Sequence, residues 1–274
     1  MSQLWNLAQF HWDDVTPAAV DQDLLETVKT AALVEANSAD YVIYLRNVFA
    51  DDEVFKAAAD EWGKEEALHG AALARWALAV DPHFDFPAAL ARFRAGYGLP
   101  LQASSSVRGS RSGELVARCV VESGTCSFYS AMRDHSPDPV LREICLRIAQ
   151  DEARHYRLFE THLQRYLKAE PLPWLARLKV AWGRVDEAED DELAYAFYSA
   201  NVPSNTAPYE RQRYADAYWR RAMKLYRPQH LHGLTRMVLK AAGVRLEGRP
   251  LRLALACLWW GLQRRLRRLN TAPG

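Results

Sequence analysis

Two Glu-x-x-His segments are the residues of this sequence best suited to chemistry. One runs from Glu66 to His69 and the other from Glu152 to His155. In a helix this spacing places a carboxylate and an imidazole on one face, one turn apart. A single pair arises by chance in many helices, whereas two pairs on long helices of one chain indicate a shared metal site.

Two further glutamates complete a symmetrical set of ligands. Glu35 lies 31 residues before Glu66 (66 − 35), and Glu122 lies 30 residues before Glu152 (152 − 122). Each interrupts the apolar face of its helix, where an uncompensated buried carboxylate is costly and a metal ion would offset that cost. Four carboxylates and two imidazoles suit two transition-metal ions with open coordination positions. The alternative is a set of surface salt-bridge residues on amphipathic helices.

Three more residues are candidates to support these ligands. Glu65 and Asp151 each directly precede a predicted ligand, so either could accept the free ring N–H of the histidine on the opposite helix. Thr125 lies three residues after Glu122 on the same helix face. Its hydroxyl could meet bound oxygen or pass a proton, or it could bond to its own helix backbone.

The elements that must position these residues are long helices. Apolar residues recur at steps of three or four, and prolines and glycines cluster between the periodic stretches. The pattern predicts helices over residues 16–49, 51–80, 113–134 and 138–168. Residues 81–112 are predicted to form a long crossover, in which residues 87–95 could be a short helix. Two antiparallel hairpins joined by a long crossover make a ferritin-like four-helix bundle, as in the known di-iron and di-manganese carboxylate bundles. We therefore expect an all-α fold, with this bundle over residues 1–170.

The remaining residues, 171–274, are expected to form a helical extension that packs on the bundle. Helices are predicted over residues 174–200, 208–226, 228–242 and 250–269. The last has a leucine stripe and ends in four arginines beside Trp259 and Trp260. We favour a helix that covers the bundle; peripheral contact with a membrane or with an acidic carrier protein remains an alternative.

Composition narrows the class of protein. The formal net charge is +1, which argues against a nucleic-acid partner. The four cysteines form no C-x-x-C pair and are expected to be free thiols. The N-terminus lacks a signal-peptide pattern, and the most apolar run is too short to cross a bilayer, so a cytoplasmic protein is expected. His230 and His232 are expected at the surface.

The two metal-binding segments resemble those of the acyl-carrier-protein desaturases, within the di-iron carboxylate superfamily. Residues 62–70 (WGKEEALHG) are similar to the desaturase pattern W-x-x-E-E-x-x-H-G, and residues 148–155 (IAQDEARH) are similar to I-A-x-D-E-x-R-H. Thr125 matches a threonine one turn beyond the third-helix ligand of that family. The resemblance spans residues 20–168, and residues 170–274 do not align to that family.

The resemblance implies an enzyme that activates dioxygen at two iron ions, with a mixed manganese–iron centre left open. It further implies an external electron donor, such as ferredoxin or a reductase, and an apolar substrate, free or carrier-bound, that is desaturated, hydroxylated or N-oxygenated. A homodimer remains open.

Other branches of the superfamily fit less well. Leu73 stands where ribonucleotide reductase small subunits carry a radical tyrosine, and the chain lacks the C-x-x-C pairs of rubrerythrins. Aldehyde-deformylating oxygenases and di-iron N-oxygenases remain open. The alternative functions are an iron-oxidising, iron-storing or peroxide-scavenging protein, and a metal-free binding module.

Overall fold

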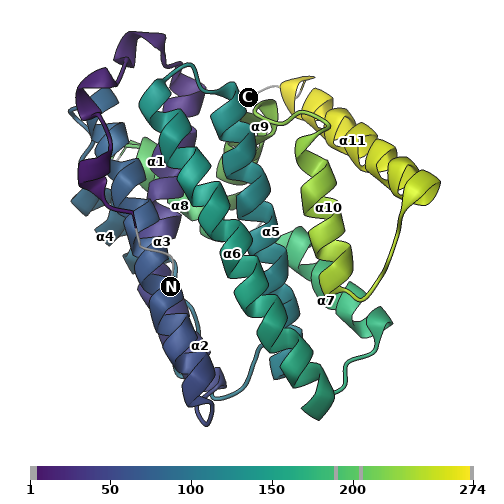
Figure 1. The fold of residues 1–274 in the computed structure, drawn as a ribbon. Coiled ribbons are helices and arrows are strands. Elements are labelled where there is room, and N and C mark those ends of the chain that lie inside the picture. The colour runs from purple at the N-terminus through teal and green to yellow at the C-terminus, as the bar shows by residue number, and fades with distance from the viewer. Residues whose placement is uncertain (1–4, 188–190, 204–205, 272–274) are drawn as a thin grey trace. The chain divides into compact units, whose positions relative to one another are not determined.

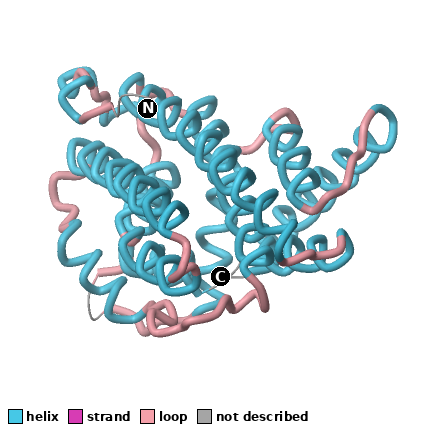
Figure 2. The backbone as a smooth tube through the Cα atoms, turned by 60° about the horizontal axis from the view of Figure 1, so that its bottom comes forward, coloured by secondary structure: helices cyan, strands magenta, loops and turns pink. Residues whose placement is uncertain are grey.

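The protein is all-helical wherever the computed structural model describes it, which is residues 5–187, 191–203 and 206–271. No strand occurs in these ranges, and helices follow one another through loops, of which the one over residues 97–110 is long (Figures 1 and 2). The α-helices are α1 Gln22–Ala36, α2 Ser38–Val48, α3 Glu53–Val80, α4 Phe86–Gly96, α5 Arg111–His135, α6 Pro139–Ala169, α7 Trp174–Glu187, α8 Asp191–Asn201, α9 Arg211–Lys224, α10 His230–Ala241 and α11 Gly248–Thr271. The all-α prediction is confirmed.

The chain forms two compact units. Unit 1 comprises Met1–Ser104, Arg133–Ile148 and Glu189–Tyr218, and unit 2 comprises Ser105–Met132, Ala149–Ala188 and Trp219–Gly274. The division falls within α5, α6 and α9, so each of these helices contributes residues to both units. The expected boundary at residue 170, between a bundle and an extension, stays a prediction.

In unit 1, α1 and α3 form an antiparallel pair. Lys29 near the middle of α1 binds the Asp81 carboxylate just after α3 at 2.6 Å, and Ser38 at the start of α2 donates to the Gly63 carbonyl at 3.2 Å. The helix α8 packs against α1, where the Asn201 amide donates to the Glu26 carbonyl at 3.1 Å. Unit 1 thus holds the first predicted hairpin together with a helix from far along the chain.

The first predicted helix is interrupted where a continuous one was expected over residues 16–49. Residues 17–19 form a short 3-10 turn, and α1 begins only after Asp21, whose side chain accepts from the Leu24 N–H. A second break falls at Asn37, between α1 and α2. There the Arg94 guanidinium binds the Ala36 carbonyl at 2.8 Å and the Asn37 side-chain oxygen at 3.2 Å. The Ala36 carbonyl, which has no partner within the helix at its end, thus accepts a hydrogen bond from a residue distant in sequence. A local sequence pattern does not reveal such a contact.

In unit 2, α5 and the second half of α6 are antiparallel. Near one end, Ser112 donates to the Glu170 carbonyl at 2.8 Å, and further along, the Cys126 thiol lies 3.4 Å from the Ala149 carbonyl. The helix α10 packs on this pair, since the Tyr156 hydroxyl donates to the Met237 carbonyl at 2.9 Å. The second predicted hairpin is therefore present within this unit.

The structure also tests the expected placement of the cysteines and of two histidines. All four cysteines are free, as predicted. His232 is exposed, but His230 is buried, so its placement at the surface was wrong. Its ring accepts from the Arg227 N–H and its carbonyl accepts from Ser127 of α5, contacts that a sequence spacing cannot show.

In the described part of the chain, no helix combines the length and the apolar composition that a membrane span requires.

Candidate metal-binding sites

Unit 1 brings together three of the predicted ligands, which we call the first half-site: Glu35, Glu66 and His69. Glu35 comes from the last turn of α1, and the other two come from the middle of α3. All three are buried, and each offers a ligand atom within 4.8 Å of the others. The His69 Nδ1 lies 3.6 Å from the Glu35 Oε2.

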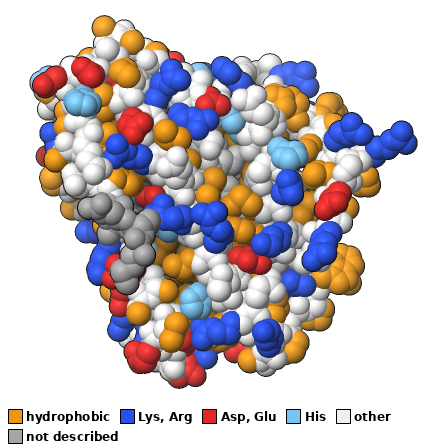
Figure 3. All heavy atoms as spheres, in the orientation of Figure 1, with side chains coloured by type: hydrophobic (Ala, Val, Ile, Leu, Met, Phe, Trp, Pro, Cys, Tyr) orange, Lys and Arg blue, Asp and Glu red, His pale blue; other side chains and the backbone are white. Residues whose placement is uncertain are grey.

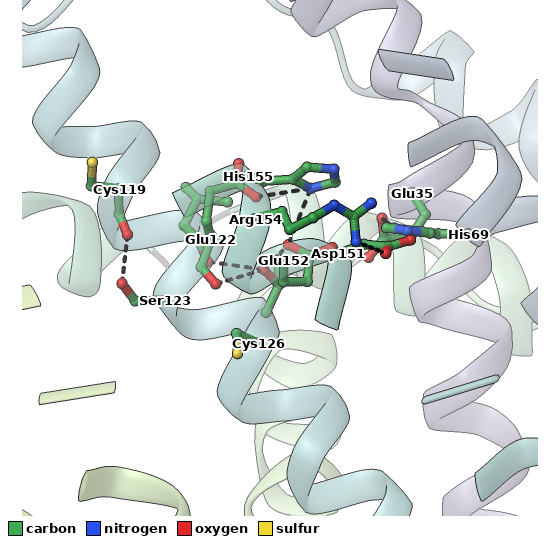
Figure 4. A network of polar contacts seen from close by, with 12 residues as sticks. Glu35, His69, Cys119, Glu122, Ser123, Cys126, Asp151, Glu152, Arg154 and His155 are labelled. Atoms are coloured by element: carbon green, nitrogen blue, oxygen red, sulfur yellow. Dashed lines mark hydrogen bonds and ion pairs between the residues drawn. The ribbon is translucent and has the colours of Figure 1, made fainter. Parts of the chain in front are cut away.

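Unit 2 brings together the other three, the second half-site: Glu122, Glu152 and His155. Glu122 comes from α5, and Glu152 and His155 come from α6. They too are buried, with ligand atoms within 4.8 Å of one another. The His155 Nδ1 lies 3.5 Å from the Glu122 Oε2 and 3.9 Å from the Glu152 Oε2, contacts that Figure 4 draws as dashed lines. The two half-sites thus repeat one arrangement of the same residue types.

The separations within each half-site fit ligands of one ion better than hydrogen bonds. A hydrogen bond between an imidazole nitrogen and a carboxylate has a length of about 2.7–3.2 Å. Two ligand atoms bound about 2.1 Å from one ion lie about 3.0–3.4 Å apart at octahedral or tetrahedral angles. The observed 3.5 and 3.6 Å are too long for the former and close to the latter. Each half-site could therefore hold a metal ion.

Burial makes it costly in free energy for Glu122 of the second half-site to carry its negative charge without a cation nearby. Burial raises the pKa of Glu122 to about 8; the negative charge of Glu152 acts in the same direction, and His155 opposes it. Among the described residues, no hydrogen-bond partner accompanies the buried Oε1 of Glu122. A group with an orphaned buried oxygen and a raised pKa is one that a metal ion would stabilise in its charged form.

Thr125 lies against the second half-site, as its position after Glu122 predicts. Its Oγ1 is 2.5 Å from the Glu152 Oε2, and it also lies 3.2 Å from the Val121 carbonyl and 3.3 Å from the Glu122 carbonyl. The single hydroxyl proton can serve one of these acceptors at a time. The Thr125 hydroxyl can thus contact Glu152 of the half-site or donate to a carbonyl of its own helix, the two alternatives that the sequence predicts.

The two acidic residues next to the ligands differ in their surroundings. Asp151 is buried and forms a close ion pair with Arg154, one turn further along α6 (Figure 4). Glu65 is half-buried on α3. Their expected contacts with the histidine of the opposite hairpin stay predictions. The Arg154 guanidinium pairs with the Asp151 carboxylate, one position before Glu152 in the sequence.

Two features of the first half-site were not predicted. The Trp5 ring stacks on the His69 ring, with centroids 5.9 Å apart and planes inclined by 8°. Gly70 lies so close to α1 that an added Cβ would meet the Ala36 backbone nitrogen at 2.7 Å. The sequence carries a signal for Gly70, which follows His69 in the matched desaturase pattern, but no local pattern connects Trp5 with residue 69.

Comparison with known proteins adds no family assignment. No protein-family model matches the chain, and no curated protein sequence matches it either.

Proposed function

We propose that the two half-sites together hold two iron ions within a ferritin-like four-helix bundle, and that the protein is an oxidoreductase that activates dioxygen there to oxidise an apolar substrate. The observation that carries the proposal is the repetition of one buried arrangement. In both half-sites a histidine Nδ1 lies 3.5–3.6 Å from a glutamate Oε2 of the neighbouring antiparallel helix. Two such sets supply the six ligands of a di-iron carboxylate centre.

The donor atoms favour iron over other common ions. Four carboxylates and two imidazoles are too rich in nitrogen for calcium or magnesium and contain none of the thiolates of structural zinc sites. Iron is a natural occupant of such a set, and a mixed manganese–iron pair is the nearest alternative. Open positions on such ions are where dioxygen binds in di-iron enzymes.

The protein's own residues have distinct roles in this proposal. When bound and reduced, the iron pair supplies the electrons and the binding positions for dioxygen. Thr125 holds a proton at Oγ1 beside the Glu152 carboxylate, where the hydroxyl could pass a proton into the half-site. Trp5 covers the His69 ring and keeps water from that face of the ligand.

Electrons and substrate come from outside the chain. The sequence has no C-x-x-C pair for an iron–sulfur or rubredoxin-type centre, so we propose an external donor such as ferredoxin or a reductase. The substrate is proposed to be apolar, free or bound to a carrier, and to undergo desaturation, hydroxylation or N-oxygenation, by the likeness of residues 62–70 and 148–155 to the desaturase segments. The enzyme acts as a monomer or a homodimer in this scheme.

Metal stoichiometry in matched variants tests the proposal. Glu122 and Glu114 are both buried in α5, but only Glu122 belongs to a half-site. The protein loaded with iron(II) without oxygen is expected to hold two ions per chain, and Glu122→Gln is expected to hold one, whereas Glu114→Gln keeps two. Retention of two ions in Glu122→Gln would contradict the assigned ligands. Steady accumulation of many ferric ions per chain would instead indicate an iron-storing protein.

A further inference from the structure

The C-terminal helix α11 is rich in apolar residues but buries almost none of them. All 24 of its residues are described, and Leu251 is the one that is buried. Leu253 is 68% exposed, Leu258 is 40% exposed and Trp260 is 58% exposed. Leaving such side chains in water costs about 25 cal/mol for each Å² of apolar surface. Exposed apolar residues that share one face of a helix mark a surface that binds a partner.

Leu253 and Trp260 lie on one stripe along the helix, whereas Leu258 lies on a different face. Leu253, Cys257 and Trp260 follow one another at steps of four and three residues, which places them on a common face. The same face carries exposed Arg249 one turn before them and exposed Arg264 one turn after. We call these five residues the α11 stripe. In Figure 3, hydrophobic and basic side chains lie together where Figure 1 draws α11.

The positive charge of the chain is concentrated in the C-terminal segment that contains this helix. Residues 219–274 contain thirteen lysines and arginines and a single acidic residue, Glu247. The other 218 residues contain 22 basic (35 − 13) and 33 acidic (34 − 1) residues. The net charge of +1 is therefore the sum of +12 in residues 219–274 and −11 in the rest of the chain. Within α11 itself there are six arginines and no aspartate or glutamate. The partner of α11 is therefore expected to be anionic as well as apolar.

We propose that α11 docks the protein onto a bilayer surface that contains anionic lipids. The helix would lie in the plane of the interface over about 36 Å, at 1.5 Å per residue. Leu253, Cys257 and Trp260 would enter the boundary between headgroups and acyl chains, while the arginines reach lipid phosphates. Tryptophan between apolar and basic residues is the composition that favours this depth of the membrane.

Other anionic or apolar partners fit the stripe less well. Nucleic-acid interfaces are strongly basic but more polar, and they give no role to an exposed leucine and tryptophan between the arginines. A second copy of the chain would bring two stripes of like charge together, which is unfavourable. A lipid surface satisfies both the arginines and the apolar residues at once.

Vesicle flotation of the full chain tests the proposal. The probes are vesicles of phosphatidylcholine alone and vesicles that also contain phosphatidylglycerol. The protein is expected to float with the mixed vesicles and much less with the neutral ones, and added salt should weaken the binding because it screens the arginines. Cys257 is the exposed one of the four cysteines, so an environment-sensitive dye on its thiol should shift to the blue on binding.

Two variants and one control separate the contributions. Arg264→Gln/Arg267→Gln/Arg268→Gln is expected to weaken binding about fivefold per arginine, on the order of 100-fold in all. Leu253→Ser/Trp260→Ser is expected to lose the blue shift and most of the flotation. Val54 and Val107 are comparably exposed outside α11, so Val54→Ser/Val107→Ser should bind as the unaltered protein does. Unchanged helicity and metal content would show that all three variants fold.

Several results would overturn the proposal. One is an absence of flotation, and another is equal binding to neutral and mixed vesicles. Tighter binding to a single-stranded RNA than to mixed vesicles would assign the stripe to nucleic acid. A dimer in the absence of vesicles that Leu253→Ser/Trp260→Ser converts to a monomer would assign it to contact between copies.

Discussion

The two half-sites contain the same residue types and share one histidine–glutamate contact, but they lie in different surroundings. In both, a histidine Nδ1 lies 3.5–3.6 Å from a glutamate of the neighbouring helix. The first is closely packed, with an aromatic ring stacked on His69 and a glycine against α1. The second has the Thr125 hydroxyl against Glu152. Matching residue types with unequal neighbours lead us to propose that the two half-sites differ in role.

The helices around them differ in the same way. In unit 1, the helix that carries Glu35 ends one residue later, and Arg94 satisfies the Ala36 carbonyl. In unit 2, the helix that carries Glu122 continues without a break for more than three turns. We infer that the first half-site is held by close packing and the second is the one at which protons are handled.

Close packing of the first half-site predicts the largest effect. Gly70→Ala should destabilise the protein by about 3 kcal/mol, because the new methyl group would press on the α1 backbone. Gly124→Ala is the matched control in α5, since its added Cβ meets nothing within 4 Å beyond its own stretch of helix. It should be neutral or stabilise by up to about 1 kcal/mol. Chemical denaturation measures both; equal effects would refute the packing difference.

Proton handling at the second half-site predicts the next effect. Thr125→Val keeps the shape of the side chain but removes its hydroxyl, so oxidation of substrate should slow by about 30-fold if the hydroxyl relays a proton. Thr125→Ser retains the hydroxyl and should recover most of the rate. Iron content should stay the same in all three proteins. A valine variant with the full rate, or a serine variant as slow as valine, would assign Thr125 to helix structure alone.

The raised pKa of Glu122 predicts a pH dependence of the metal-free protein. Because the folded pKa of about 8 exceeds the ordinary value of 4.5, the folded state holds a proton that the unfolded state has lost between these values. Stability should therefore fall as pH rises through this window, by at most about 1.4 kcal/mol per pH unit, and level off above it. Glu122→Gln should flatten the slope. Denaturation at several pH values checks this, and an unchanged slope would contradict it.

The smallest effect is expected at Trp5. Trp5→Leu removes the ring that stacks on His69, at a cost of about 1 kcal/mol of stability. It should also speed the loss of iron to a chelator, because water reaches that ligand more easily. Trp182 on α7 is an exposed tryptophan far along the chain, so Trp182→Leu serves as the control. Equal chelation rates in the two variants would remove Trp5 from the first half-site.

The sequence predicted which residues the structure brings together in each half-site, but not what surrounds them. Glu66 and His69 share a helix face by local geometry, and Glu35 follows from the register of an antiparallel hairpin, so periodicity was sufficient for all three. The break at Asn37 was missed because it depends on Arg94, and the stacking of Trp5 was missed because it joins residues 64 positions apart (69 − 5). His230 was misplaced for the same reason, since its burial depends on contacts with α5.

The central claim is that the two half-sites form one two-iron centre. X-ray absorption at the iron edge of the iron(II)-loaded protein tests it directly. We predict oxygen and nitrogen ligands near 2.1 Å and an iron neighbour at about 3.5–4 Å, the latter lost in both Glu35→Gln and Glu122→Gln. Two irons per chain with no iron–iron contribution would show that each half-site binds its ion alone and would contradict the account.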